Sequence, residues 1–197
     1  MTVYLIRHGE TVWNRERRYQ GSQDISLSRE GREKLRPAEM RPEVVYVTRM
    51  KRTRETAELL FPGVPQREVP GLEEMCFGVF EGRNYIEMEH DPDYRAWVDG
   101  GCEGRCPGGE DQAEFNARTG AAFSALMEEA RRQGAVSLVI VAHGGTQMSL
   151  LSQYGEPSKD YYQWLTGNGK GYLLDASDWE KSRKLRVLDK ISYTGET

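Results

Sequence analysis

Two of the three histidines in the chain, His8 and His143, end short apolar runs, and each is followed by glycine. Imidazole offers a neutral nitrogen that can act as a nucleophile or carry a proton near neutral pH. A following glycine has no Cβ, so a ligand can approach the backbone closely. A lone histidine at such a place is more often a packed core residue, but two in matching contexts favour one shared site.

Arg7, directly before His8, indicates which charge that site would bind. A guanidinium group stays protonated, so it would repel a metal ion held by the two histidines. An anion reverses the sign, and the planar fork of arginine matches two oxygens of a phosphate group.

A second group of cations, Lys51, Arg52 and Arg54, crowds the first turn of an expected helix. Cations at that end oppose the helix dipole, so a nearby anion is expected to compensate. Arg52 lies near the inward-facing stripe of this helix and is the pocket candidate. Lys51 and Arg54 are interpreted as solvated.

Phosphoryl transfer through imidazole also needs an acid to protonate the leaving oxygen. Glu73 and Glu74 supply carboxyl groups in PGLEEMCFGVFEG, residues 70–82, a glycine-bounded stretch with aromatic residues. Neighbouring residues of an extended segment point in opposite directions, so only one of the two faces the pocket. The residues alone leave that choice open.

The elements that must position these groups alternate between strands and helices. Unbroken apolar runs predict central strands, and a proline-bounded run predicts one nearer an edge. The expected strands are 2–7, 44–47 and 137–142, with 66–69 near the edge. Helices are expected after the N-cap candidate Ser28, over 52–60, and after PGGED, residues 107–111, as far as Gly134, which closes the helix. This alternation predicts an α/β sandwich, in which ligands bind beyond the carboxyl ends of the parallel strands, where both histidines lie.

The length of 197 residues predicts a single domain, 1–197, with a lid-like excursion at about 76–109 that is rich in glycine, acidic and aromatic residues. Two short helices are expected around MEHDP, residues 88–92. The aromatic residues Phe80, Tyr85 and Trp97 either pack on a nucleoside-like base or belong to the core.

Composition argues against several classes of partner. The net charge of -4 and the pI near 5.6 argue against nucleic-acid and anionic-membrane binders. The longest apolar run, 135–142, is too short to cross a bilayer, and no signal peptide is recognised, so a cytoplasmic location is expected. Cys76, Cys102 and Cys106 are an odd number, which suits a reducing compartment, and the last two are interpreted as free loop thiols.

With these residues assembled, the chain resembles the histidine phosphatase superfamily, phosphoglycerate mutase-like branch, over nearly its whole length. Five motifs occur in the family's order. They are RHGETVWN at 7–14 with YQG at 19–21 and D-x-x-L-S-x-x-G at 24–31, KRTRETA at 51–57, LEEMCFGVFEG at 72–82, PGGE at 107–110 and AHGG at 142–145. The resemblance implies a three-layer α/β/α sandwich with a mostly parallel central sheet. One local departure is Thr48-Arg49 where relatives often carry Ser-Pro.

The resemblance also implies roles for the site residues. His8 is the expected nucleophile and becomes a phosphohistidine, while Glu74, rather than Glu73, protonates the leaving group and then activates water. Arg7, Arg52 and His143 are expected to hold the transferred phosphoryl group. The implied substrate-binding set is Arg7, Asn14, Gln20, Gly21, Arg52, His143 and the backbone amide of Gly144. No metal and no organic cofactor is expected.

The function expected from this resemblance is a metal-independent phosphomonoesterase acting on a small phosphorylated metabolite, with α-ribazole 5'-phosphate as one candidate because short members resemble such phosphatases. The alternatives are a phosphoglycerate mutase, usually a longer chain, and an inactive phospho-ligand binding module. Arg15, Arg17 and Arg18 either hold a second anionic group of the substrate or form a solvated surface. The oligomeric state is left open, with a homodimer among the options.

Overall fold

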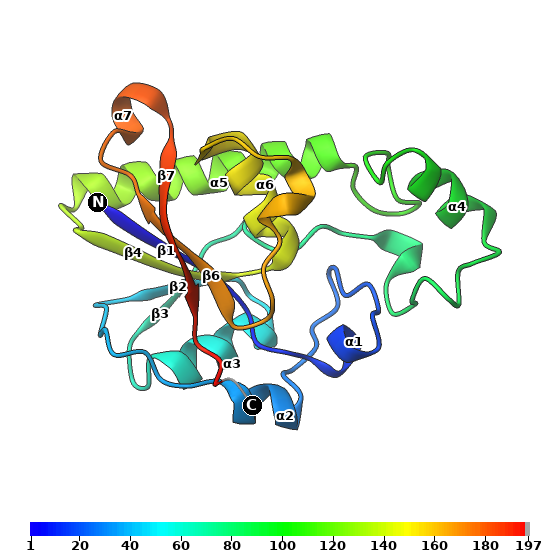
Figure 1. The fold of residues 1–197 in the computed structure, drawn as a ribbon, viewed down its shortest axis with the longest axis horizontal. Helices are drawn as coiled ribbons and strands as arrows, with labels where there is room; N and C mark the ends of the chain where they lie inside the picture. The colour runs from blue at the N-terminus through cyan, green and yellow to red at the C-terminus, as the bar shows by residue number, and fades with distance from the viewer. Residues whose placement is uncertain (196–197) are drawn as a thin grey trace.

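The computed structural model describes residues 1–195 of the chain, and these form a sheet with helices on both of its faces (Figure 1). The seven-stranded sheet has the order β3-β2-β4-β1-β6-β7-β5. Its strands are β1 (Thr2–Arg7), β2 (Val45–Val47), β3 (Gln66–Glu68), β4 (Ser137–Ala142), β5 (Gly155–Glu156), β6 (Lys170–Asp175) and β7 (Leu185–Ser192). The two strands expected to be central, β1 and β4, are adjacent in the middle of the sheet, and β3 forms an edge, as predicted.

Side chains of β1 alternate between the two faces of the sheet, as the strand period of two requires. Val3 and Leu5 pack in one buried cluster with residues of α5 and α6, whereas Ile6 packs in a second cluster with Ala57 and Leu60 of α3. Both faces of β1 are therefore covered, which explains why its sequence shows no polar alternation.

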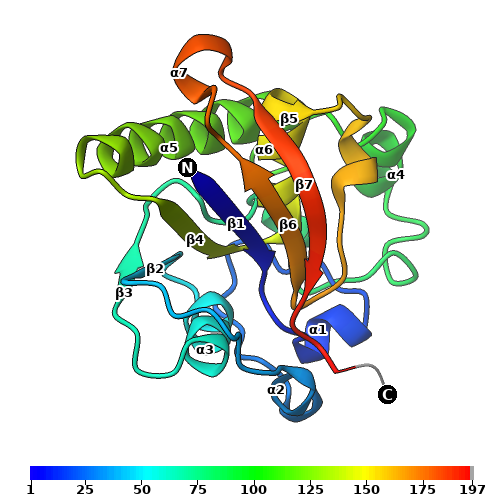
Figure 2. The ribbon, with the colours of Figure 1, turned by 60° about the vertical axis from the view of Figure 1, so that its left-hand side comes forward.

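The helices complete a three-layer sandwich (Figure 2). Their bounds are α1 (Val12–Arg15), α2 (Arg29–Lys34), α3 (Lys51–Leu60), α4 (Pro92–Asp99), α5 (Gln112–Arg132), α6 (Gly144–Tyr154) and α7 (Trp179–Ser182), with 3-10 helices η1 (Gly78–Phe80) and η2 (Tyr161–Trp164). α5 and α6 cover one face, and α3 and α2 lie on the other (Figures 1 and 2). Ser28 caps α2 as predicted, and Gly134 follows α5 with a φ of 70°.

The sheet is mixed, with a parallel half that was predicted from sequence and an antiparallel half that was not. β3, β2, β4 and β1 run parallel to one another, while β6 pairs antiparallel with both β1 and β7. β7 exposes many of its residues and carries Arg, Asp and Lys, so it has no apolar run that would indicate a strand. No helix within residues 1–195 is long and apolar enough to cross a bilayer.

The excursion at 76–109 has its own small core, which takes in two of its three aromatic residues named above. Phe80 and Trp97 are buried in this cluster with Cys106, whereas Tyr85 is exposed. The expectation of two short helices around residues 88–92 is wrong in part. Only α4 follows, capped by Asp91, while the residues before it form turns because they pair through short-range hydrogen bonds.

Candidate active site

His8 and His143 lie side by side because of the register of the two central strands. Arg7 pairs with Ala142 in the parallel ladder, so the residue after each strand meets its counterpart. The backbone N–H of His8 donates to the Ala142 carbonyl at 2.9 Å, and the two imidazole centroids are 5.4 Å apart. Both rings are buried. The repeated His-Gly pattern thus marks one site at the carboxyl edge of the sheet.

The imidazole of His8 is held as a neutral ring with one free lone pair. Its Nδ1 lies 2.7 Å from the Gly9 carbonyl oxygen. A carbonyl only accepts, so Nδ1 carries the proton and Nε2 keeps the lone pair. Burial lowers the pKa of His8 well below its ordinary value, and the charges of Arg52 and Arg7 lower it further. Nε2 is therefore available to attack an electrophile.

His143 is fixed through both ring nitrogens. Arg52 Nε donates to His143 Nδ1 at 3.2 Å, which leaves the proton on Nε2, 3.0 Å from the Thr48 hydroxyl oxygen. Burial, followed by the charge of Arg52, lowers the pKa of His143 well below its ordinary value. The departure at Thr48-Arg49 thus retains a hydroxyl group beside the second histidine.

Arg52 is fully buried, although it lies in the first turn of α3 together with other cationic residues. Its Nη2 donates to the Gly21 carbonyl at 2.8 Å and its Nη1 to the Gln23 carbonyl at 2.6 Å. Burial lowers its pKa to about 10, opposed by the carboxylate of Glu74. Lys51 is solvent-exposed, as expected.

Arg7 has a buried guanidinium nitrogen that no residue within 1–195 satisfies. Its Nη1 donates to the Thr166 carbonyl at 2.6 Å, whereas its Nε has no hydrogen-bond partner in this range. An unpaired buried donor is costly, so a guanidinium edge left free beside two imidazoles fits an anionic ligand. Gly144 permits this placement, because a Cβ there would lie 3.2 Å from Arg7 Nε.

The two neighbouring glutamates diverge, as expected for an extended segment. Glu74 Oε2 accepts the N–H of Gly145 at 3.0 Å, in the first turn of α6, and its Oε1 accepts the N–H of Met75 at 2.9 Å. Glu73 turns back to the N–H of Gly71 at 2.7 Å. Only Glu74 therefore reaches the segment that follows His143.

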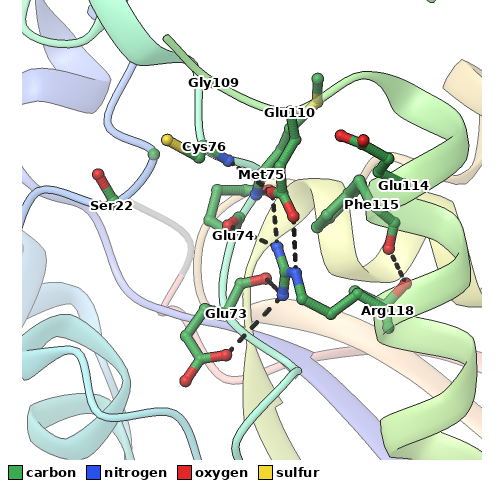
Figure 3. A network of polar contacts seen from close by, with 12 residues as sticks. Ser22, Glu73, Glu74, Met75, Cys76, Gly109, Glu110, Glu114, Phe115 and Arg118 are labelled. Carbon is green, nitrogen blue, oxygen red and sulfur yellow. Dashed lines mark hydrogen bonds and ion pairs between the residues drawn. The ribbon is translucent and has the colours of Figure 1, made fainter. Parts of the chain in front are cut away.

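Arg118 of α5 fixes the loop that carries Glu74 (Figure 3). Its guanidinium donates to the carbonyls of Gly71, Glu73 and Glu74 at 3.0, 3.2 and 3.3 Å. Glu110 accepts from Arg118 Nε at 2.8 Å and from Nη2 at 2.7 Å, and it also accepts the N–H of Cys76 at 2.9 Å. Because one arginine binds three carbonyls of this short segment, the acid-bearing loop has little freedom to move.

The other expected substrate-binding residues surround this centre in different ways. Asn14 completes the capping box of α1, whose N-cap is Thr11, with its Oδ1 accepting the Thr11 N–H at 3.0 Å. Gln20 is buried, and within residues 1–195 its Oε1 has no partner. Gly21 contributes its carbonyl to Arg52, and Gly144 begins α6 directly after His143.

Asn168 is a site residue that sequence reasoning missed. Its Nδ2 lies 3.1 Å from the His8 carbonyl, 3.3 Å from the Gly9 carbonyl and 3.1 Å from Asn14 Oδ1, so it ties the nucleophile segment to α1. The available signal is a glycine-flanked asparagine, Gly167-Asn-Gly, which is typical of a tight turn.

Of the arginines at 15, 17 and 18, the first and last pair with acids, and Arg17 Nη1 donates to the Tyr85 hydroxyl at 3.3 Å. Arg15 pairs with Glu30 at 3.1 Å and Arg18 with Glu87 at 2.7 Å. Such exposed pairs favour the solvated-surface interpretation over a second anion site. Over residues 1–195, no three His, Cys, Asp or Glu side chains gather in a way that would hold a metal ion.

We expect the two buried histidines to make folding stability depend on pH. Their pKa values in the fold lie below the ordinary 6.5, so only the unfolded chain takes up these protons as pH falls. Stability is therefore present above about pH 6.5 and falls below it by about 1.4 kcal/mol per pH unit for each histidine. Urea unfolding across that range measures the slope. His8→Asn should remove about half of it, whereas the exposed-histidine control His90→Asn should keep it; equal slopes in all three would contradict this account.

We expect Gly145→Ala to displace the acid while the fold persists. An added Cβ would overlap Glu74 Oε1 and lie 3.0 Å from its Cδ. The end of a glutamate can move aside, so kcat should fall about 10- to 100-fold with little change in melting temperature. Gly104→Ala is the matched control, because a Cβ there meets no atom within 4 Å. Full activity in Gly145→Ala would show that the position of Glu74 is unimportant.

The chain is similar to a protein family and to several known proteins. A model of the histidine phosphatase superfamily (branch 1) matches residues 3–184. A probable phosphoglycerate mutase GpmB from Escherichia fergusonii is 35% identical over 153 residues, 73% of this chain and 70% of that protein. The structure of the alpha-ribazole phosphatase from Shigella flexneri has a TM-score of 0.81 at 26% identity and covers 100% of both chains. A phosphoglycerate mutase structure from Thermus thermophilus has a TM-score of 0.72 at 29% identity, over 98% of this chain and 99% of that one.

Proposed function

Because this chain belongs to the histidine phosphatase superfamily, branch 1, as its motifs predicted, we propose that it hydrolyses a small phosphomonoester through a phosphohistidine on His8. The observation that carries the proposal is the His8 imidazole, which has its lone pair on Nε2 and a pKa lowered by burial and by the nearby charges of Arg52 and Arg7, together with an Arg7 Nε that lacks a partner within residues 1–195. A nucleophile and an anion-binding donor thus lie next to each other in a buried site.

In the first step, His8 Nε2 attacks phosphorus and the bond from phosphorus to the ester oxygen breaks. Arg7 and Arg52 stabilise the negative charge on the phosphoryl oxygens, and His143 shares its Nε2–H between the Thr48 hydroxyl and one of these oxygens. Glu74 gives a proton to the departing oxygen, which leaves as a neutral alcohol. Side chains of the protein itself thus supply the nucleophile, the cations and the acid.

In the second step, the phosphohistidine is hydrolysed. Glu74, now a carboxylate, takes a proton from water, and the resulting hydroxide attacks phosphorus. The bond from phosphorus to His8 Nε2 breaks, inorganic phosphate leaves, and the neutral imidazole is restored. The proton taken up by Glu74 is the one needed for the next cycle.

α-Ribazole 5'-phosphate is the substrate we propose to test first. Support comes from the structural similarity to the Shigella flexneri alpha-ribazole phosphatase over the full length of both chains. Purified protein should release phosphate from this ester without added metal. Phosphate release from other monoesters, but not from this one, would retain the reaction and reject this substrate.

The relatives named as probable phosphoglycerate mutases favour one alternative, a mutase reaction. Incubation with 3-phosphoglycerate and catalytic bisphosphoglycerate distinguishes the two. We expect phosphate to form faster than 2-phosphoglycerate, and the reverse order would replace the phosphatase by the mutase. A protein that binds phosphate monoesters but turns none over would instead be a phospho-ligand binding module.

A further inference from the structure

A cavity of about 180 Å³ lies against Glu74, and the proposed mechanism leaves it without a role. Glu74 and Gly145 form part of its wall, and the remaining wall is mostly aromatic and sulfur-containing. Its ring-bearing residues include Phe77, Trp97, Tyr161 and Tyr162, and Met148 of α6 adds a thioether. The cavity therefore adjoins the side chain that protonates the leaving oxygen in the proposed function.

The polar ends of two wall residues, Trp97 and Tyr162, are turned to backbone carbonyls of the protein. Trp97 Nε1 donates to the Gly104 carbonyl at 3.0 Å, and the Tyr162 hydroxyl donates to the Gly101 carbonyl at 3.4 Å. Burial, followed by the charge of Glu74, raises the pKa of Tyr161, so its phenol stays neutral. What remains to contact a ligand is largely ring faces and thioether.

The charged groups that line this cavity are acidic only. Among its lining residues within 1–195, only Glu74 is an acid, and none is Lys, Arg or His. A leaving group bearing a carboxylate or a second phosphate would lose its hydration there without a cation to replace it. An uncharged apolar group would instead gain from being transferred out of water.

On the basis of the proposed function, we propose that this cavity binds the leaving group and selects phosphomonoesters of uncharged aromatic alcohols. A bond to the ester oxygen places the alcohol carbon next to Glu74, and the cavity begins there. An apolar cavity of about 150 Å³ is enough to hold a benzene ring, so this one accepts a single aromatic ring. Phosphoglycerate, with its carboxylate, does not fit this chemistry.

A second hollow also borders Glu74 and makes the opposite prediction. It is lined by Arg49, Glu73, Glu110 and other polar residues, and at about 420 Å³ it is larger and more open. A leaving group bound there would be polar and would contact Arg49. The two hollows can therefore be distinguished by the polarity of the preferred ester.

Benzyl phosphate and n-propyl phosphate test the proposal, because both leaving groups are simple alkanols and differ mainly in the ring. The kcat/KM for benzyl phosphate should be at least about tenfold higher in the wild type. Tyr162→Ala, which removes an exposed wall residue, should reduce this ratio to about threefold or less. Tyr85→Ala, an exposed tyrosine outside the cavity, should leave the ratio unchanged.

Other results would overturn the cavity's role without affecting the proposed function. These are a benzyl to propyl ratio near one, or a preference for glycerol 3-phosphate that Arg49→Ala abolishes. If no ester is hydrolysed, calorimetry with 2-phenylethylphosphonate and n-butylphosphonate still decides. Tighter binding of the phenyl compound, lost in Tyr162→Ala, would support the cavity while the proposed hydrolysis fails. Equal affinity for both compounds would reject the proposed role of the cavity.

Discussion

His8→Ala should abolish turnover, lowering kcat by at least about 10^4-fold, because no other group can take over a nucleophilic attack that forms a covalent intermediate. His143 cannot substitute, since its Nδ1 accepts from Arg52 and its Nε2 faces Thr48. Phosphate release under saturating substrate measures the loss.

The third histidine provides the control for this loss. His90 is exposed and lies in the excursion, so His90→Ala should retain full kcat. Far-UV circular dichroism should match between the two variants. A His8→Ala protein that is folded and retains more than about one hundredth of the wild-type kcat would mean that water attacks the substrate directly.

Glu74→Gln should lower kcat for an alkyl phosphate by about 10^2- to 10^4-fold, the range of a lost general acid. The amide keeps the shape of the side chain but cannot give a proton to the departing oxygen. For p-nitrophenyl phosphate, whose leaving group needs no proton, the loss in the first step should be much smaller. The variant should therefore show a steep dependence on leaving-group basicity that the wild type lacks.

Glu73→Gln is the matched control, because Glu73 is adjacent in sequence and turned toward Gly71. Its kcat should stay within about threefold of wild type for both esters, because the amide oxygen of glutamine can still accept the N–H of Gly71. The comparison uses kcat/KM, which reports the first step, because Glu74 also activates water in the second step for both esters. An equal loss of kcat/KM for both esters in Glu74→Gln, or a larger loss in Glu73→Gln, would show that Glu74 is not the proton donor.

The parallel half of the fold and the place of the site could be predicted because they depend on local patterns. Apolar runs marked β1 and β4, and the His-Gly ending of each run marked the edge where ligands bind. Arg52 could be identified as the pocket residue, and Lys51 as solvated, because the helical period places Arg52 on the inward side of α3. The divergence of Glu73 and Glu74 followed from strand geometry alone.

The parts that escaped prediction depend on long-range pairing. Arg118 contacts the Glu74 loop more than forty positions earlier in the chain, and Asn168 contacts the carbonyl of His8 at a separation of 160 positions. The sequence around Arg118 or Asn168 contains no pattern that indicates its distant partner. β7 pairs with β6 through backbone hydrogen bonds while exposing charged side chains, so its pattern is not typical of a buried strand.

The most direct test of the account is to trap the phosphoenzyme. Wild-type protein mixed with a ³²P-labelled monoester and quenched within one turnover should carry label that is stable to alkali and lost in acid. Peptide mapping should place this label on His8, and His8→Ala should carry none. Substrate turnover by the wild type without any labelled protein, or with label on another residue, would contradict covalent catalysis by His8.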